Sequence, residues 1–252
     1  MSVTIITGAG SGIGAAVARR LAKLDACLVL HGQGRDAAGI SRLQKVAAEC
    51  EKAGAKVGYS TGDLAKAGTA AALVGAAREK FGSIDAIVHA AGFADRRGFA
   101  QLPRNDLERA FAVMAGAFLE MTSAALPDLT RAGCGRVVAV SSFAAHRFTP
   151  DSTYPGSGAA KAALEVLVKS LAIELAASGA TANVVVPGFT RKDEGLTGAL
   201  DAQAWQAVAK ANPMSRLAEP DEVASVIVFL LSGEASHVTG ALLPVDGGLT
   251  LI

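Results

Sequence analysis

Short apolar runs alternate along the chain with longer segments in which apolar residues recur every three to four positions. The short runs predict strands at Val3–Thr7, Ala26–His31, Lys56–Ser60, Ala86–His89, Arg136–Val140, Thr181–Val186 and Ala241–Val245. The periodic segments predict helices at Gly14–Leu24, Gly39–Ala53, Thr69–Phe81, Asn105–Thr130, Ala159–Ala177, Ala202–Ala211 and Pro220–Leu231. This alternation requires crossover connections and is typical of a parallel sheet that helices cover on both faces.

The predicted strands are nearly all apolar, as strands buried on both faces are. Because crossovers are right-handed, the expected α/β arrangement is a Rossmann-type, doubly wound parallel sheet with helices on both faces. The pattern is not interrupted by a linker-like stretch, an internal repeat or a low-complexity tract. We therefore expect residues 1–252 to form a single domain.

Composition and charge narrow the classes of partner. The chain has 24 Lys and Arg against 23 Asp and Glu, with two Tyr and one Trp, so it lacks the basic face and aromatic platforms of nucleic-acid-binding proteins. We find no signal peptide, and no uninterrupted apolar run approaches the ~20 residues of a membrane helix. Cys27, Cys50 and Cys134 have no metal-like spacing, and an odd, scattered set suits a reducing compartment. These features favour a cytoplasmic protein with a small-molecule partner, no metal and no membrane contact.

The first predicted strand leads into a glycine-rich turn. The turn reads Thr7-Gly8-Ala9-Gly10-Ser11-Gly12-Ile13-Gly14 and opens the first predicted helix. Glycines let the backbone turn sharply and approach a pyrophosphate, and the helix N-terminus adds a partial positive charge. A tight structural turn would also explain such glycines. The position after the first strand of a βαβ unit favours dinucleotide binding.

The turn resembles the TGxxxGxG motif of the short-chain dehydrogenase/reductase family. Further family motifs follow in order: Asp63 after the third strand, His89–Gly92 in place of the NNAG element, Pro187-Gly188 after the sixth strand, and Arg216–Ala224 and Val245–Gly248 near the C-terminus. The likeness spans essentially the whole chain, which is similar to the 3-oxoacyl-acyl-carrier-protein reductase-like members. It implies an oxidoreductase that interconverts a ketone and a secondary alcohol by hydride transfer, and a homo-oligomer, either tetramer or dimer.

The resemblance also implies which residues bind the cofactor. Asp63 would lie near the adenine, and Pro187-Gly188 beside the nicotinamide. The implied set is Gly8, Gly10, Ser11, Gly12, Ile13, Gly14, Arg35, Asp63, Leu64, Ala91, Gly92, Lys161, Pro187, Gly188 and Thr190. A substrate loop is expected around residues 189–212. Its charged residues, Arg191, Lys192, Asp193 and Glu194, indicate an anionic substrate or a contact with cofactor phosphate, although a solvated loop explains them equally well.

The end of the second strand bears on the choice of cofactor. NAD enzymes of this architecture carry a carboxylate there for the ribose hydroxyls, whereas NADP enzymes supply a basic residue. The acidic position falls near Gly32, and Arg35 follows closely. This favours NADP, with NAD possible. The alternative is that Arg35 and Asp36 are solvated loop charges.

The catalytic positions depart from the family's pattern, in which a tyrosine stands four residues before a lysine. Ser142 and Lys161 occupy the family's serine and lysine positions, but Ser157 stands four residues before Lys161. The nearest tyrosine is Tyr154, seven residues before Lys161. It precedes Pro155, which suits a first helical turn, so we expect Tyr154 just outside the helix. The implied catalytic set is Ser142, Tyr154 and Lys161. The sequence leaves open whether Tyr154 is a displaced proton donor or the donor has been lost.

A second departure concerns the path of the proton. Met114 falls where the family has an asparagine that holds a water, and methionine cannot make two strong hydrogen bonds. The path must then differ or be absent. The competing hypothesis is a cofactor-binding protein without dehydrogenase activity, either a sensor or a partner subunit. His146 as a replacement acid and a Ser157–Lys161 nucleophile pair are further alternatives.

Overall fold

Seven parallel strands form one sheet in the order β3-β2-β1-β4-β5-β6-β7. The computed structural model describes residues 2–24, 26–131, 133–150, 153–193 and 202–252. The strands are β1 (Val3–Thr7), β2 (Cys27–Gly32), β3 (Lys56–Thr61), β4 (Ala86–His89), β5 (Arg136–Val140), β6 (Thr181–Pro187) and β7 (Leu242–Val245). Their order and direction confirm the predicted Rossmann-type fold.

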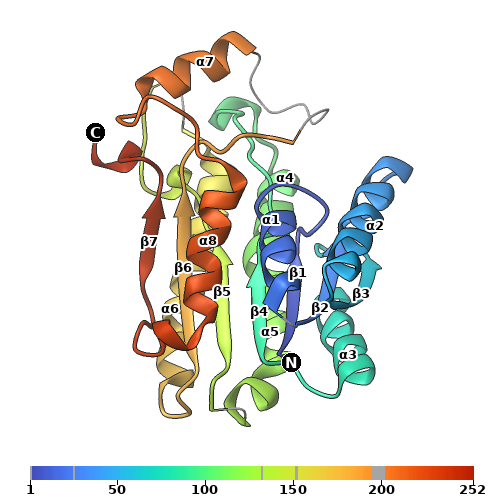
Figure 1. Ribbon diagram of the computed structural model, residues 1–252. Coiled ribbons are helices and arrows are strands. Elements are labelled where there is room, and N and C mark those ends of the chain that lie inside the picture. The colour runs from blue at the N-terminus through green and yellow to red at the C-terminus, as the bar shows by residue number, and fades with distance from the viewer. Residues whose placement is uncertain (1, 25, 132, 151–152, 194–201) are drawn as a thin grey trace.

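Helices cover both faces of the sheet, and the chain forms a single domain (Figure 1). One face carries α1 (Gly12–Leu21), α2 (Ala37–Lys52) and α8 (Pro220–Leu231), and the other carries α3 (Thr69–Phe81), α5 (Ala117–Arg131) and α6 (Pro155–Ala176). Two further helices, α4 (Arg104–Phe111) and α7 (Ala202–Ala211), complete the set among the described residues. In Figure 1, α7 lies beyond the carboxyl ends of the strands.

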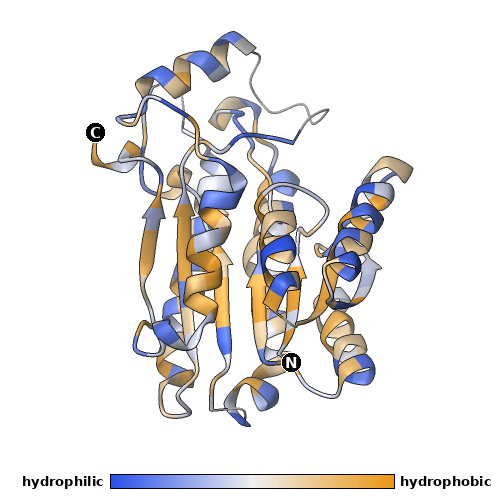
Figure 2. Cartoon of the chain, viewed as in Figure 1, coloured by the Kyte–Doolittle hydropathy of each residue, from blue (hydrophilic) through white to orange (hydrophobic). Residues whose placement is uncertain are grey.

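Two apolar layers hold the helices on the sheet. Ile6, Leu28 and Leu30 are completely buried against α1, α2 and α8, and Ile5 and Ile87 are buried on the opposite face. Figure 2 shows the same distribution, with apolar strands inside and hydrophilic residues along the outer helices. This burial on both faces explains why the strands read as continuous apolar runs.

The predicted helix over Asn105–Thr130 is one continuous helical stretch with an irregularity in its middle. Residues 112–116 form a π-helical turn between α4 and α5. By length and composition alone, Arg104–Arg131 is the one helix among the described residues that could cross a membrane. Half of its most apolar window is buried inside the protein, which is the pattern of a core helix.

The largest difference from the expected boundaries is at α6, which begins at Pro155 and not at Ala159. The weak helix formers Gly156, Ser157 and Gly158 conceal the first turn in the sequence. Pro155 suits the first helical position because its φ is already helical and its missing N–H has no partner there. The N–H of Gly158 donates to the carbonyl of Tyr154 over 2.8 Å, which closes the first turn.

The strand order reverses between β1 and β4. From β1 the chain builds outward through β2 to β3, and it then returns to place β4 on the other side of β1. Ligands of open α/β sheets bind beyond the carboxyl ends of the strands at such a reversal. The glycine-rich turn after β1 and the His89–Gly92 segment after β4 meet at this position.

Candidate active site

The glycine-rich turn leaves open space for a ligand. Gly8 has a φ of +68° and lies so close to the segment after β4 that a Cβ would come within 2.9 Å of the Ala90 carbonyl. Gly12 has a φ of +53°, and a Cβ there would meet nothing within 4 Å. Ser11, the N-cap of α1, makes no side-chain cap. Open backbone and a helix N-terminus that its own N-cap side chain does not cap fit the pyrophosphate of a nicotinamide dinucleotide.

A cavity of about 440 Å³ adjoins this turn at the carboxyl ends of β2, β3 and β4. The predicted residues that line it are Gly8, Arg35, Asp63, Leu64, Ala91 and Gly92. Arg109, which the sequence did not indicate, donates to both oxygens of Asp63 over 3.0 and 3.1 Å. This guanidinium lowers the pKa of Asp63, so the carboxylate is charged at neutral pH.

A neighbouring cavity of about 260 Å³ brings two arginines together at the end of β2. Its lining includes Gly10, Ser11, Gly32, Arg35 and Arg42. Asp36 also lines it, but its carboxylate accepts the N–H of Gly39 over 2.6 Å and caps α2. Sequence reasoning missed Arg42, which lies inside a helix. The signal that could have found it is its position seven residues after Arg35, in the second turn of α2.

The three candidate catalytic residues line one cavity of about 220 Å³, the candidate substrate cavity, at the carboxyl ends of β5 and β6. Ser142, Tyr154 and Lys161 meet there with Ile13, Gly92, Pro187, Gly188 and Thr190. Aromatic rings form much of the remaining wall, namely Phe93, Phe143, Phe189 and Trp205. The structure thus brings the predicted catalytic and nicotinamide-side residues into a single cavity.

Tyr154 lies just outside α6, as the sequence predicts. It is the N-cap residue, with a left-handed backbone (φ 44°, ψ 48°), and only 4% of it is exposed. Its ring packs edge-on against Phe143, with centroids 5.8 Å apart, and the Arg96 guanidinium lies 5.7 Å from the ring centre. Because the backbone of Tyr154 is not helical, its side chain need not follow the direction that α6 would impose. Tyr154 therefore lines the same cavity as Lys161, which lies seven positions later.

Lys161 is buried at the floor of the cavity. Its Nζ donates to the carbonyl oxygen of Val140 over 2.6 Å, and a Cβ at Gly92 would lie 3.0 Å from the same nitrogen. Burial lowers the pKa of Lys161 to about 8, against the opposing charge of Glu165 one helical turn later. The Glu165 carboxylate accepts from the hydroxyl of Ser141 and pairs with His146 Nε2 at 2.8 Å. His146 therefore faces Glu165, and it is not among the residues that line the substrate cavity.

His89 replaces the first family asparagine and braces the π-helical turn. Its Nε2 lies 3.0 Å from the Met114 carbonyl, and its Nδ1 lies 3.0 Å from the Thr7 hydroxyl. Burial, reinforced by the charge of Lys161, lowers the pKa of His89 to about 3, so the ring is neutral. A carbonyl only accepts, so Nε2 carries the proton and the Thr7 hydroxyl donates to Nδ1. The ring of His89 thus joins the end of β1 and the π-helical turn through one hydrogen bond to each.

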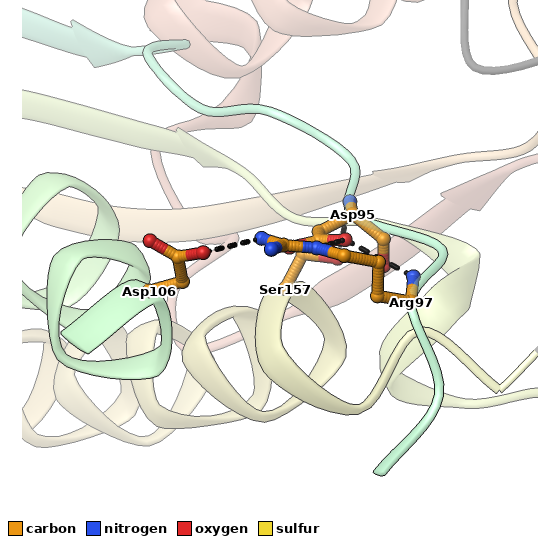
Figure 3. Close-up of polar contacts among 4 residues, drawn as sticks. All are labelled: Asp95, Arg97, Asp106 and Ser157. Atoms are coloured by element: carbon orange, nitrogen blue, oxygen red, sulfur yellow. Dashed lines mark hydrogen bonds and ion pairs between the residues drawn. The ribbon is translucent and has the colours of Figure 1, made fainter. Parts of the chain in front are cut away.

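Ser157, at the family's tyrosine position, supports the loop after β4 (Figure 3). Its hydroxyl accepts the N–H of Asp95 over 3.2 Å. The Asp95 carboxylate binds Arg97, which also reaches Asp106 at the start of α4 over 2.6 Å. Ser157 therefore links α6 to a loop held by charged contacts. It makes no contact that would fit the alternative of a Ser157–Lys161 nucleophile pair.

The charged residues in the segment after β6 have different surroundings. Thr190, predicted near the cofactor, donates its hydroxyl to the Gly188 carbonyl over 3.1 Å and lines the substrate cavity. Arg191 pairs with Glu219 at 2.7 Å, Lys192 lines the same cavity, and Asp193 Oδ2 accepts the N–H of Gly12 over 2.8 Å. Glu194 and residues 195–201 of the expected substrate loop lie outside the described residues.

The C-terminal motifs shape the framework around the cavities. Glu219 and Glu222 form a capping box at the start of α8, and Arg216 pairs with Glu222 over 2.7 Å. Gly188 lies so close to the last turn that a Cβ would come within 2.9 Å of Asp246. These motifs therefore serve the framework of the site.

Comparison with known proteins identifies the family. The family model described as enoyl-(acyl carrier protein) reductase matches residues 8–250. The chain belongs to the short-chain dehydrogenase/reductase family. It is 36% identical to cis-4-hydroxycyclohexanecarboxylate dehydrogenase of Sinomonas cyclohexanicum, over 99% of this chain and 97% of that protein. It is also 36% identical to the NAD(P)⁺-dependent L-rhamnose 1-dehydrogenase of Azotobacter vinelandii, covering 97% and 95%.

Solved structures agree with this assignment. The chain superposes on a 3-oxoacyl-(acyl-carrier-protein) reductase from Agrobacterium tumefaciens with NADP bound, with a TM-score of 0.87, 29% identity and coverage of 98% and 93%. This short-chain dehydrogenase/reductase is therefore a nicotinamide-dependent oxidoreductase that interconverts a carbonyl group and an alcohol. The alternative of a family member without dehydrogenase activity is set aside.

Proposed function

We propose that this enzyme prefers NADP and reduces a ketone, or oxidises the matching secondary alcohol, at the cavity that holds Ser142, Tyr154 and Lys161. The observation that carries the cofactor preference is the presence of both Arg35 and Arg42 among the residues that line the cavity at the end of β2. NAD enzymes place a carboxylate there, and here the position near Gly32 has no side chain. Two guanidinium groups suit the 2′-phosphate of NADP, which a single positive charge would hold less firmly.

The one carboxylate that lines this cavity does not oppose the assignment. Asp36 is held by the N–H of Gly39 and serves as the cap of α2. Its Oδ1 is therefore committed to the cap of the helix.

The proposed catalytic roles follow from position in the substrate cavity. The bound cofactor supplies the hydride. Ser142 would hold the substrate oxygen, and the Tyr154 hydroxyl would give a proton to that oxygen or take one from it. Lys161, which lines the same cavity, would assist this proton transfer and would hold the nicotinamide ribose. Phe143 and Phe189 would exclude water from the reacting carbon.

Cofactor titration with a substrate panel tests this proposal. Calorimetry should show tighter binding of NADPH than of NADH, and cyclic or aromatic ketones should be reduced with NADPH. Equal affinities, or a preference for NADH, would overturn the cofactor assignment. Absence of turnover with every ketone and secondary alcohol, together with normal NADPH binding, would overturn the catalytic one.

A second candidate reaction is reduction of a conjugated carbon–carbon double bond, as the description of the matching family model suggests. The favouring observation is the position of Tyr154, three residues further from Lys161 than the family's tyrosine and outside α6. Hydride attack at the β-carbon places the enone oxygen two bonds further from the hydride than the oxygen of a simple ketone. A displaced proton donor matches a displaced oxygen. Turnover of enoyl thioesters in addition to ketones would establish this second reaction.

We also propose a cytoplasmic homo-oligomer, either tetramer or dimer, with a substrate loop around residues 189–212. Two large apolar side chains project from the outer face of α6: Val166 is 62% exposed and Ile173 79% exposed. Their spacing of seven residues puts them on one face of the helix. Leu119 on α5 and Phe111 on α4 are also exposed. Such a surface suits helix contacts with a second copy.

A further inference from the structure

The N-terminus of α1 is capped by a residue from the far end of the chain. Ser11 provides no side-chain cap, and the first turn of α1 contains no acidic residue. The N–H of Gly12 instead donates to Oδ2 of Asp193, 181 positions later, over 2.8 Å. A carboxylate is favourable at a helix N-terminus because it meets the helix dipole and an unpaired N–H.

The same N–H belongs to the turn that would bind the pyrophosphate. Phosphate groups and carboxylates bind to the same feature, a helix N-terminus with free backbone N–H groups. They cannot share it, because two anions within a few ångströms repel each other. We infer that the Asp193 carboxylate occupies the anion position of the glycine-rich turn in the cofactor-free enzyme, so that the cofactor's pyrophosphate must displace it.

Displacement of Asp193 also changes the substrate cavity. Asp193 follows Phe189 by four residues on the segment after β6, and Phe189 stacks against Phe143 with ring centroids 4.4 Å apart. Phe189 also contacts Trp205 edge-on, with ring centroids 6.3 Å apart. A shift of residues 190–193 therefore reaches the aromatic wall of the cavity. Cofactor binding would therefore alter this wall of the cavity through the exchange of anions at the glycine-rich turn.

This inference takes from the proposed function only that the cofactor is a nicotinamide dinucleotide. NADPH and NADH both carry the pyrophosphate, so removal of the Asp193 charge should strengthen the binding of both by the same factor. The preference for NADPH would be unaffected. An incorrect cofactor preference would therefore leave this inference intact, and the reverse also holds.

The test compares Asp193→Asn with Asp85→Asn by calorimetry. The amide keeps the size of Asp193 and an acceptor oxygen but removes the charge. Asp85 is the matched control: it is also half-buried and its carboxylate accepts a backbone N–H, that of Val3, over 2.7 Å, at the opposite end of the sheet. We expect Asp193→Asn to bind NADPH and NADH about tenfold more tightly, and Asp85→Asn to bind them as the wild type does. Unchanged or weaker binding by Asp193→Asn would overturn the inference.

Thermal unfolding separates competition from a purely structural role. By linkage, Asp193→Asn should lower the Tm of the cofactor-free enzyme more than that of the enzyme saturated with NADPH. An equal loss in both states would mean that Asp193 stays in place when the cofactor binds, and it would overturn the inference.

The single tryptophan reports the movement directly. Inorganic pyrophosphate, added to the wild type without nucleotide, should change the emission of Trp205 as Phe189 shifts. If calorimetry shows that pyrophosphate binds and the Trp205 emission stays constant, the coupling to the substrate cavity is wrong.

Discussion

The hydroxyl of Ser157 accepts a hydrogen bond from the backbone N–H of Asp95, 3.2 Å away. The contact joins the first turn of α6 to the loop that follows β4, and this loop supplies Phe93 and Ala94 to the substrate cavity. Ser157 stands four residues before Lys161, where the family has its proton donor. In this enzyme the position is occupied by a serine that anchors a loop and also lines the cavity, and Tyr154 is the one tyrosine among the described lining residues.

Removal of the Tyr154 hydroxyl should abolish most turnover. Tyr154→Phe should lower kcat by about 10²–10⁴-fold, because general acid catalysis contributes that much, while the Kd for NADPH stays unchanged. Steady-state kinetics and calorimetry measure the two quantities. Ser157→Ala is the control, and it should keep most of the turnover. The reverse pattern, with Tyr154→Phe active and Ser157→Ala inactive, would assign the chemistry to the helix position.

Both arginines of the cavity at the end of β2 should contribute to NADPH selectivity. Arg35→Ala and Arg42→Ala should each weaken NADPH binding by about 1–3 kcal/mol, the range for a charge-assisted contact. NADH binding should change little because it lacks the 2′-phosphate. Arg19→Ala is a suitable control, since Arg19 pairs with Glu49 on the surface over 2.7 Å. Equal losses for NADPH and NADH would place the two arginines elsewhere on the cofactor.

Two buried histidines should make the fold sensitive to acid. Burial lowers the pKa of His89 to about 3 and that of His31 to about 4, whereas the unfolded chain has a value near 6.5. Between these values the unfolded chain binds more protons than the folded one, so stability rises with pH. The free energy of unfolding should therefore fall as pH drops from about 6.5 towards 4, as urea titrations would measure.

His89→Asn provides the matched variant for this prediction. An amide can donate to the Met114 carbonyl and accept from Thr7, so both contacts of the ring have a replacement. The variant should lose less stability than the wild type between pH 6.5 and 4. An identical pH dependence in the two proteins would show that His89 is not responsible.

A charge on the outer face of α6 should disrupt the oligomer. Ile173→Glu would place a carboxylate within the proposed contact between subunits, where desolvation makes it costly. Light scattering should show a smaller mass than that of the wild type. Leu24→Glu is the control, because Leu24 is 63% exposed but lies away from α6. A wild type that is already monomeric at micromolar concentration would contradict the proposal.

Local sequence patterns were sufficient for the fold and for much of the cofactor site. Burial on both faces makes each strand an apolar run, and such a run can be recognised in the sequence without knowing which strands lie beside it. Gly8 and Gly12 were recognisable because a turn with positive φ needs glycine wherever it occurs. The apolar periodicity missed the first turn of α6, because Gly156 and Gly158 have low intrinsic helix propensity, although Pro155 marked that end of the helix.

The contacts that decide the chemistry required the tertiary structure. The sequence by itself determined that a glycine-rich turn follows the first strand, that Ser142 follows the fifth strand, and that Lys161 lies on the next helix. This is the order of the family. The sequence did not determine that Arg42 joins Arg35, that Arg109 binds Asp63, or that Asp193 caps α1. The last two pairs join elements that only the packing of the sheet brings together, whereas Arg35 and Arg42 lie at the start of α2 and needed only the path of the loop before it. A hydrogen bond depends on distance and direction in space, and the separation of two residues along the chain, 181 positions for Gly12 and Asp193, carries no information about either.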